Sequence, residues 1–168
     1  MEGRTVASSE TLMTHRALPG DTNAAGNIHG GIILKHIDHA GAVCAMRHAR
    51  GNSVVTASID RMEFKAPVHV GELIMLKACV NFVGQKSMEV GVRVESENLF
   101  TGDVRHVASA YLTFVALDND RKPTRIPPLI LETPKQQRRH QEASLRREVR
   151  QKERHREKQA QLKQDSPE

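Results

Sequence analysis

Asp38 is the clearest candidate for chemistry, because it is a carboxylate inside an otherwise apolar stretch. On a helix it would be surrounded mostly by small side chains, which leave room beside the carboxylate. Those helical neighbours are Gly31, Leu34, Lys35, Gly41, Ala42 and Ala45. A carboxylate in such a space can act as a general base or as a nucleophile. The alternative is that Asp38 faces solvent or pairs with Lys35 or Arg61.

A loop rich in glycine and asparagine precedes this stretch. Gly30 and Gly31 stand where a helix would begin, and its free N–H groups and positive dipole end can bind an oxyanion. Two glycines allow a substrate carbonyl to approach closely, while Asn23 and Asn27 can add amide donors. The structural alternative is that the glycines permit tight helix packing and that Asn27 caps the helix. His29 is expected to orient backbone or a water molecule.

Histidines cluster in the same region, but their spacing does not favour a metal site. His36 and His39 are three residues apart, whereas two zinc ligands on one helix usually stand at i and i+4 with a further ligand. No Cys-x-x-Cys completes such a set. Neither Ser58 nor Ser87 lies in a Gly-x-Ser-x-Gly elbow, and Cys44 falls on the apolar face of the expected helix. We therefore expect no metal, no cofactor and no nucleophile triad.

The hydrophobic pattern indicates which elements must hold these residues. Apolar residues at helical spacing follow Gly31 and stop at Gly51-Asn52. One short strand is expected before the loop, at residues 11–17. Runs with a period of two then predict four strands, at residues 54–64, 72–83, 87–99 and 104–117. The last three can form an antiparallel meander whose apolar face wraps the helix.

Charge divides the chain into a nearly neutral body and a basic tail. The 168 residues carry 25 Lys and Arg against 20 Asp and Glu, which gives a net charge of +5. Residues 132–168 hold eleven basic and seven acidic side chains, so the tail accounts for +4 of that charge. Leu145, Val149 and Leu162 are too few for an apolar stripe, so a solvated or fraying helix is expected. We divide the chain into an N-terminal extension at 1–10, one domain at 11–131 and the tail at 132–168.

Composition also bears on partners and compartment. An aromatic content of 3% without Trp argues against a stacking platform for bases, and the tail intersperses acids among its cations. No apolar stretch reaches the roughly 20 residues needed to span a bilayer, and residues 1–10 lack the features of a signal peptide. Cys44 and Cys79 lie in apolar runs, which is typical of buried thiols in a reducing compartment. We expect a cytoplasmic protein with no membrane or nucleic-acid partner.

Three segments together resemble hotdog-fold acyl-CoA thioesterases, a family of bacterial broad-specificity enzymes and the two-domain cytosolic brain-type acyl-CoA hydrolase. They are DTNAAGNIHGG at 21–31, IDHAG at 37–41 and VVTASID at 54–60. The resemblance implies an α+β fold in which a five-stranded antiparallel sheet curls around a central helix. It also implies homodimers joined through edge strands, and trimers of those dimers. Bacterial relatives often have Asp at the position of Asn27 and Phe at that of His29.

The resemblance implies a role for each candidate residue in hydrolysis of acyl-CoA. In this family a helical carboxylate, matching Asp38, and a loop asparagine, matching Asn23, come from opposite subunits. Asp38 would then act as base or nucleophile, Asn23 would orient the water, and an N–H of Gly30 or Gly31 would bind the carbonyl oxygen. Candidates for contact with CoA, chiefly with its phosphates, are Arg61, Lys65, Lys86, Ser87 and Arg93.

Two other readings of the sequence remain open. A hotdog protein can bind acyl-CoA without hydrolysing it, or can act as a dehydratase, although dehydratases of this fold generally use a His and carboxylate in another arrangement. A protein that binds nucleic acid or another partner through its basic tail would belong to a different class. Steep loss of RNA binding between about 50 and 200 mM salt would identify the latter.

Overall fold

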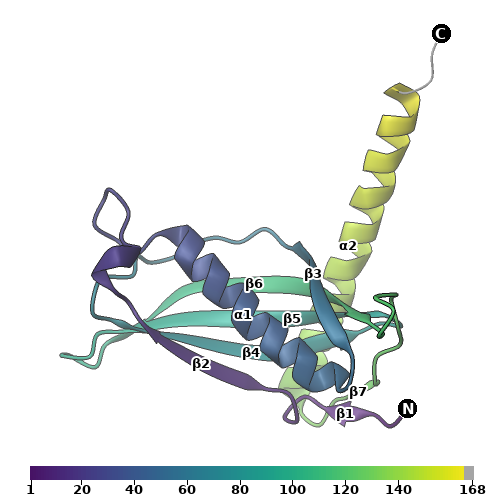
Figure 1. Cartoon of the computed structure of the whole chain (residues 1–168), viewed down its shortest axis with the longest axis horizontal. Helices are drawn as coiled ribbons and strands as arrows, with labels where there is room; N and C mark the ends of the chain where they lie inside the picture. The colour runs from purple at the N-terminus through teal and green to yellow at the C-terminus, as the bar shows by residue number, and fades with distance from the viewer. Residues whose placement is uncertain (165–168) are drawn as a thin grey trace.

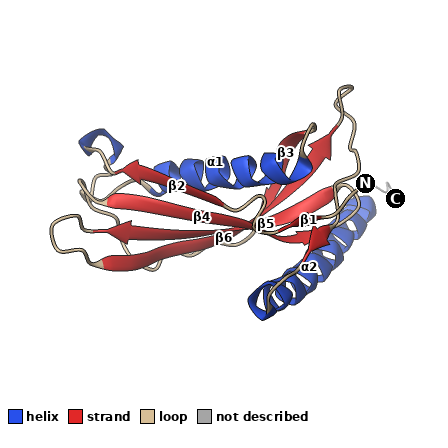
Figure 2. Ribbon diagram, turned by 90° about the horizontal axis from the view of Figure 1, so that it is seen from below, coloured by secondary structure: helices blue, strands red, loops and turns tan. Residues whose placement is uncertain are grey.

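A five-stranded antiparallel sheet forms the body of the molecule in this computed structural model, which describes residues 1–164 (Figure 1). In sheet order the strands are β2 (Thr11–Arg16), β4 (Leu73–Val83), β5 (Ser87–Glu97), β6 (Val104–Leu117) and β3 (Ser53–Ile59). Helix α1 (Gly30–Ala49) lies on one face and helix α2 (Pro134–Gln164) on the other (Figure 2). We call these the inner and the outer face of the sheet.

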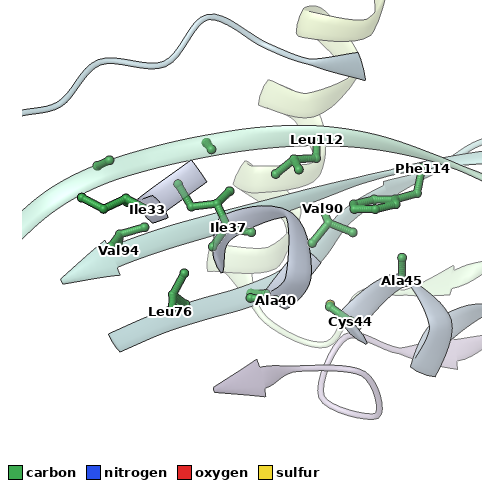
Figure 3. Packing of buried hydrophobic residues seen from close by; sticks show 14 of the residues in the cluster. Ile33, Ile37, Ala40, Cys44, Ala45, Leu76, Val90, Val94, Leu112 and Phe114 are labelled. Carbon is green, nitrogen blue, oxygen red and sulfur yellow. The ribbon is translucent and has the colours of Figure 1, made fainter. Parts of the chain in front are cut away.

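The inner face is apolar because side chains alternate along each strand, so that every second residue points towards α1. Ile37, Ala40 and Cys44 of α1 have no exposed surface and pack against Leu76, Val90, Val94 and Leu112 of the sheet (Figure 3). Gly41 permits the closest approach, since a Cβ atom there would stand 3.1 Å from the ring of Phe114. This packing fixes α1 both across and along the sheet.

The predicted helix and strands are confirmed, with shifts at their ends. The expected meander is β4, β5 and β6, which are neighbours in the sheet. The strand expected at 54–64 ends at Ile59, because the following segment leaves regular pairing but still runs beside β6. There the Asp60 N–H donates to the Tyr111 carbonyl at 2.9 Å, and the Lys65 N–H donates to the Val107 carbonyl at 2.7 Å.

Two short strands were not predicted. β1 (Arg4–Thr5) pairs in parallel with β7 (Leu129–Ile130) as a separate two-stranded sheet. A 3₁₀ turn, η1 (Pro19–Asp21), follows β2. Val6 is 2% exposed, so residues 1–10, assigned above to an extension, pack against the domain. Strands of two residues are too short to give a periodic hydrophobic signal.

The expectation of a solvated tail helix is wrong for the first half of α2. Ala143 is fully buried, and the Glu89 carboxylate, 1% exposed, accepts hydrogen bonds from Arg146 at 2.7 Å and Arg150 at 3.1 Å. The Arg146 guanidinium also lies 3.7 Å from the ring centroid of Tyr111. The helix is therefore attached by charged groups, which an apolar pattern does not reveal.

The second half of α2 agrees with the expectation, because residues 151–161 are all exposed. The side chain of Leu162 and the whole of residues 165–168 lie outside the described part of the chain. Within the described part, neither helix is long and apolar enough to cross a membrane.

We expect Glu89→Gln to loosen α2 from the sheet, because Arg146 and Arg150 would lose the carboxylate that they share. Hydrogen–deuterium exchange measured by mass spectrometry should show faster exchange of amides in residues 139–150. Glu97→Gln is the matched control, since Glu97 lies on the same strand and forms no ion pair among the described residues. Equal exchange in the two variants would contradict this role for Glu89.

Candidate active site

The loop before α1 is held by the side chain of Asn23. Its Oδ1 accepts hydrogen bonds from the Ala25 N–H at 2.9 Å and the Asn27 N–H at 3.2 Å. The Asn23 N–H in turn donates to the Asn27 carbonyl at 2.8 Å. The carbonyl end of the Asn23 amide is thus engaged in the loop, and its NH₂ end is the part that can donate to a substrate or a water.

His29, and not Asn27, caps the start of α1. The His29 Nδ1 accepts a hydrogen bond from the Gly31 N–H at 2.9 Å, which requires that nitrogen to be unprotonated. The Gly31 N–H is therefore occupied. Among the described residues no acceptor is found for the Gly30 N–H, so of the two glycines Gly30 is the one whose N–H is available to a substrate oxygen. A Cβ atom at Gly30 would stand 3.3 Å from the Phe64 ring. The Phe64 ring therefore limits the space beside the Gly30 N–H.

Asp38 lies half-buried on the side of α1 that faces β3. Its Oδ1 accepts a hydrogen bond of 2.6 Å from the Thr56 hydroxyl, and it pairs with neither Lys35 nor Arg61 among the described residues. The register of β3 shifts between Thr56 and Ser58, so that Ala57 is an extra residue of a β-bulge. Bulges of this kind turn side chains towards functional sites.

Thr56 is the functional candidate that the sequence reasoning missed. It stands within the VVTASID segment, but a threonine in a strand is unremarkable because its β-branched side chain suits a pleated sheet. No periodic signal marks a bulge, and the pairing of α1 with β3 joins residues that are 18 positions apart.

The helix geometry separates the two halves of the site within one subunit. Eight residues separate Gly30 from Asp38 along α1, a rise of about 12 Å along the axis. Reacting atoms must come within about 3–3.5 Å of one another, and an aspartate side chain is too short to close the gap. A carbonyl held at Gly30 and a water activated by Asp38 can therefore meet only if each comes from a different copy of the chain.

A free sheet edge is present where a second copy could bind. Among residues 1–164 β3 pairs only with β6, so the polar backbone groups on its other side have no partner in this described part of the chain. Val55 and Ile59 of this strand are each 40% exposed. Asp38 and Thr56 lie beside this same edge, which places the carboxylate at a potential subunit boundary.

The structure separates the expected CoA-binding residues into two groups. Arg61 and Lys65 lie on the exposed segment after β3, which also carries the Phe64 ring beside Gly30. Lys86 and Ser87 lie at the turn between β4 and β5, where Ser87 pairs with Val115. Phe64 instead bridges to Ala108 of β6. Ala108 and Val115 are seven residues apart on β6, so about 23 Å separates the two groups along this strand.

Arg93 belongs to neither of these neighbourhoods. It lies on the outer face of β5, where it pairs with Glu95 at 2.7 Å. The sheet therefore stands between Arg93 and the Asp38 of the same subunit (Figure 2).

The two cysteines and His36 have surroundings that do not suit them to catalysis. Burial raises the pKa of the Cys44 thiol to about 12, which leaves it un-ionised at neutral pH and unsuited to nucleophilic attack. Cys79 is only half-buried, on the outer face, with Arg139 Nη1 at 3.2 Å from its sulfur. His36 stacks on His15 with ring centroids 4.1 Å apart, and burial together with His15 lowers its pKa. The described residues contain no group of three or more His, Cys, Asp or Glu placed to hold a metal.

A sheet curled around a buried helix, with a carboxylate at one free edge, defines a protein of the hotdog class. The family model described as the thioesterase superfamily matches residues 25–99. The Bacillus subtilis protein named uncharacterized acyl-CoA thioester hydrolase YkhA is 39% identical over 132 residues, covering 79% of this chain and 76% of that protein. The chain therefore belongs to the acyl-CoA thioester hydrolases of the thioesterase superfamily, and it is a thioesterase.

Solved structures of this family match the fold closely. A hexameric acyl-CoA thioesterase solved without ligand is 40% identical, with a TM-score of 0.87 over 91% of this chain and 97% of that chain. The Staphylococcus aureus acyl-CoA hydrolase, in complex with butyryl coenzyme A, coenzyme A and coenzyme A disulfide, is 32% identical, with a TM-score of 0.87 over 97% of this chain and 99% of that chain. Other structures of that enzyme carry alanine in place of one aspartate, one asparagine or one threonine.

We expect His29→Ala to lower the free energy of unfolding by about 1 kcal/mol, because α1 would lose its N-cap. His29→Asn should restore most of this loss, since asparagine is a good capping residue. His39→Ala is the control, because His39 is exposed on the same helix. Urea unfolding at one fixed protein concentration measures all three, and equal stability of the two alanine variants would contradict the cap.

Proposed function

We propose that the protein hydrolyses acyl-CoA thioesters to a fatty acid and CoA. The observation that carries the proposal is the hydrogen bond from Thr56 to Asp38, which holds a half-buried carboxylate at the free edge of the sheet. The complexes of the Staphylococcus aureus relative with butyryl coenzyme A and coenzyme A support this class of substrate.

In the proposed reaction the thioester carbonyl accepts a hydrogen bond from the Gly30 N–H of one subunit. One good donor of this kind stabilises the oxyanion by about 3 kcal/mol. Asp38 of the other subunit takes a proton from a water whose oxygen attacks the carbonyl carbon, while the Asn23 NH₂ group orients that water. The tetrahedral intermediate then collapses, the C–S bond breaks, and the CoA sulfur receives the proton from Asp38. A direct attack by Asp38, through an anhydride that water then opens, gives the same products.

The roles assigned to Asp38 and Thr56 differ. Asp38 touches the reacting water or carbon and is the proposed catalytic residue. Thr56 acts through Asp38, because its hydroxyl donates to one carboxylate oxygen and leaves the other free to face the substrate. Thr56 is therefore a proposed positioning residue.

The proposed active unit is a homodimer formed by pairing β3 with β3 of a second copy. The free edge of β3, the neighbouring Asp38 and the 12 Å rise from Gly30 along α1 support it. Each homodimer would hold two equivalent sites, each with Asn23 and Gly30 from one subunit and Asp38 from the other. A trimer of such dimers is the proposed full assembly, because a relative of 40% identity is hexameric.

Arg61 and Lys65 are the proposed contacts for the CoA phosphates. Both are exposed cations on the segment that leads from β3 past Gly30, so they border the proposed site. Lys86 and Ser87 of the same subunit lie too far from Gly30, and Arg93 lies on the opposite face of the sheet. Any contact from these three residues would have to reach a site of another copy.

The proposed reaction uses water, a carboxylate and backbone donors, and CoA enters only as part of the substrate. We accordingly propose that no cofactor takes part. We further propose that the enzyme works in the cytoplasm, because Cys44 and Cys79 are both free thiols, as is usual in reducing compartments.

We expect Asp38→Asn to lower kcat at least about 100-fold, because amide nitrogen cannot accept a proton from water. Release of free thiol from acyl-CoAs of increasing chain length measures the activity and the chain-length preference together. Near-normal turnover by a folded Asp38→Asn protein would rule out the mechanism, and CoA binding by the wild type without thiol release would indicate a binding protein instead.

Two comparisons control this experiment. Asp120→Asn is matched in chemistry, and Asp120 lies exposed in the turn after β6 and outside the proposed site, so the kcat of this variant should be unchanged. Thr56→Val should lower kcat by about tenfold with little change in KM, while Thr56→Ser keeps the hydroxyl and most of the rate. Equal losses in the valine and serine variants would show that Thr56 is needed for packing and not for its hydrogen bond.

We expect inactive Asn23→Ala and inactive Asp38→Ala proteins to regain activity when mixed. In a mixed dimer one of the two sites keeps both residues, so complete random exchange would restore up to about one quarter of wild-type activity. Mass spectrometry of intact complexes verifies that subunits have exchanged. Exchange without recovered activity would place Asn23 and Asp38 of one subunit in the same site.

A further inference from the structure

Helix α2 crosses the outer face of the sheet towards the edge formed by β3. Near its start Arg139 lies against Cys79 of β4, and about two turns further on Arg146 binds Glu89 of β5. Arg150 then binds Asp60, the residue that follows β3. Because the strand order is β4, β5, β6 and β3, these contacts follow the sheet from its second strand to its free edge.

The helix does not stop at that edge. Glu157 still lines a cleft with the end of β3, and α2 continues to Gln164 (Figure 1). Seven further residues add about 10 Å, which is roughly twice the spacing between neighbouring strands. The last turns of α2 therefore extend past β3, over the position that the next strand of an extended sheet would occupy.

The point where α2 leaves the sheet carries its exposed apolar side chains. A cleft of about 660 Å³ lies between the end of β3 and the helix, lined by Ser58, Ile59, Leu145 and Val149 among others. Leu145 is 62% exposed and Val149 is 53% exposed, although the remainder of this helix is highly polar. These two residues stand at i and i+4, so they form one apolar spot on the helix surface.

We infer that this cleft and the overhanging turns of α2 form a contact surface for the copy of the chain that pairs through β3. The inference rests on the β3 pairing proposed above. A β3 strand of a second copy would lie about 4.8 Å beyond the first, directly beneath the overhanging turns. Leu145 and Val149 would then be covered, and by two-fold symmetry the second copy would contribute the same contact in return.

The charges of the overhanging segment fit a second copy better than an anionic polymer. Two acids are interspersed among four cations there, namely Lys152, Glu153, Arg154, Arg156, Glu157 and Lys158. A surface that carries both signs can complement itself across a two-fold axis, whereas the acids weaken its attraction for a polyanion. The helix is also anchored before the overhang, by Arg146 on β5 and by Arg150 at the end of β3, so it presents this surface in a fixed direction.

The test replaces the apolar spot with charge, in the double variant Leu145→Glu and Val149→Glu. The expected result is an increase of at least tenfold in the dissociation constant of the β3-paired dimer, measured by analytical ultracentrifugation over a range of concentrations. The control is the double variant Gln137→Glu and Gln141→Glu, which adds the same charge at the same spacing on exposed positions of α2 outside the cleft. Its dissociation constant should equal that of the wild type.

Three results would overturn the inference. They are an unchanged dissociation constant in the Leu145 and Val149 variant, an equal change in the control, or dissociation of a hexamer into dimers that are themselves as stable as before. The milder double variant Leu145→Ala and Val149→Ala, at exposed positions, keeps the test valid if the glutamates impair folding, and a twofold or larger increase is expected from it. A wild type that pairs but releases no thiol would refute the proposed hydrolysis while leaving this inference intact.

Discussion

The fixed rise of an α-helix is the constraint on which the proposed site depends. Packing between the sheet and Ile37, Ala40 and Gly41 prevents α1 from sliding or turning, so its start and Asp38 keep their separation of about 12 Å. The proposed oxyanion donor and the proposed base therefore cannot serve one carbonyl carbon within a single subunit. Dimerisation would in this way be a requirement of the chemistry and not only of stability.

Different kinds of interaction hold the two helices on the two faces of the sheet. On the inner face α1 is buried by apolar contact, which is strong but has little directional preference. On the outer face α2 is attached through Glu89, Arg146 and Arg150, whose hydrogen bonds set its direction across the strands. An element that must point past the sheet edge towards a second copy benefits from such directional contacts more than from a broad apolar stripe.

The edge strand β3 joins the fold, the proposed chemistry and the proposed assembly. Its bulge at Ala57 turns Thr56 towards Asp38, its unpaired side offers backbone groups to a second copy, and its end borders the cleft beside α2. Pairing at this edge would thus complete the active site and cover Leu145 and Val149 in one step. Such coupling would link turnover to protein concentration, because a dissociated subunit would lack half of each proposed site.

The long strands, their order and the helix that carries Asp38 could be predicted from the sequence, because hydrophobic periodicity and the Gly-Asn loop are local signals. The sequence also placed Asn23, Gly30 and Asp38 among the candidates by residue type and motif. Three contacts became visible in the folded chain alone: His29 accepts from the Gly31 N–H, Thr56 donates to Asp38, and α2 binds Glu89. These contacts depend on strand register, a bulge and ion pairs between residues distant in the chain, none of which leaves a periodic pattern in the sequence.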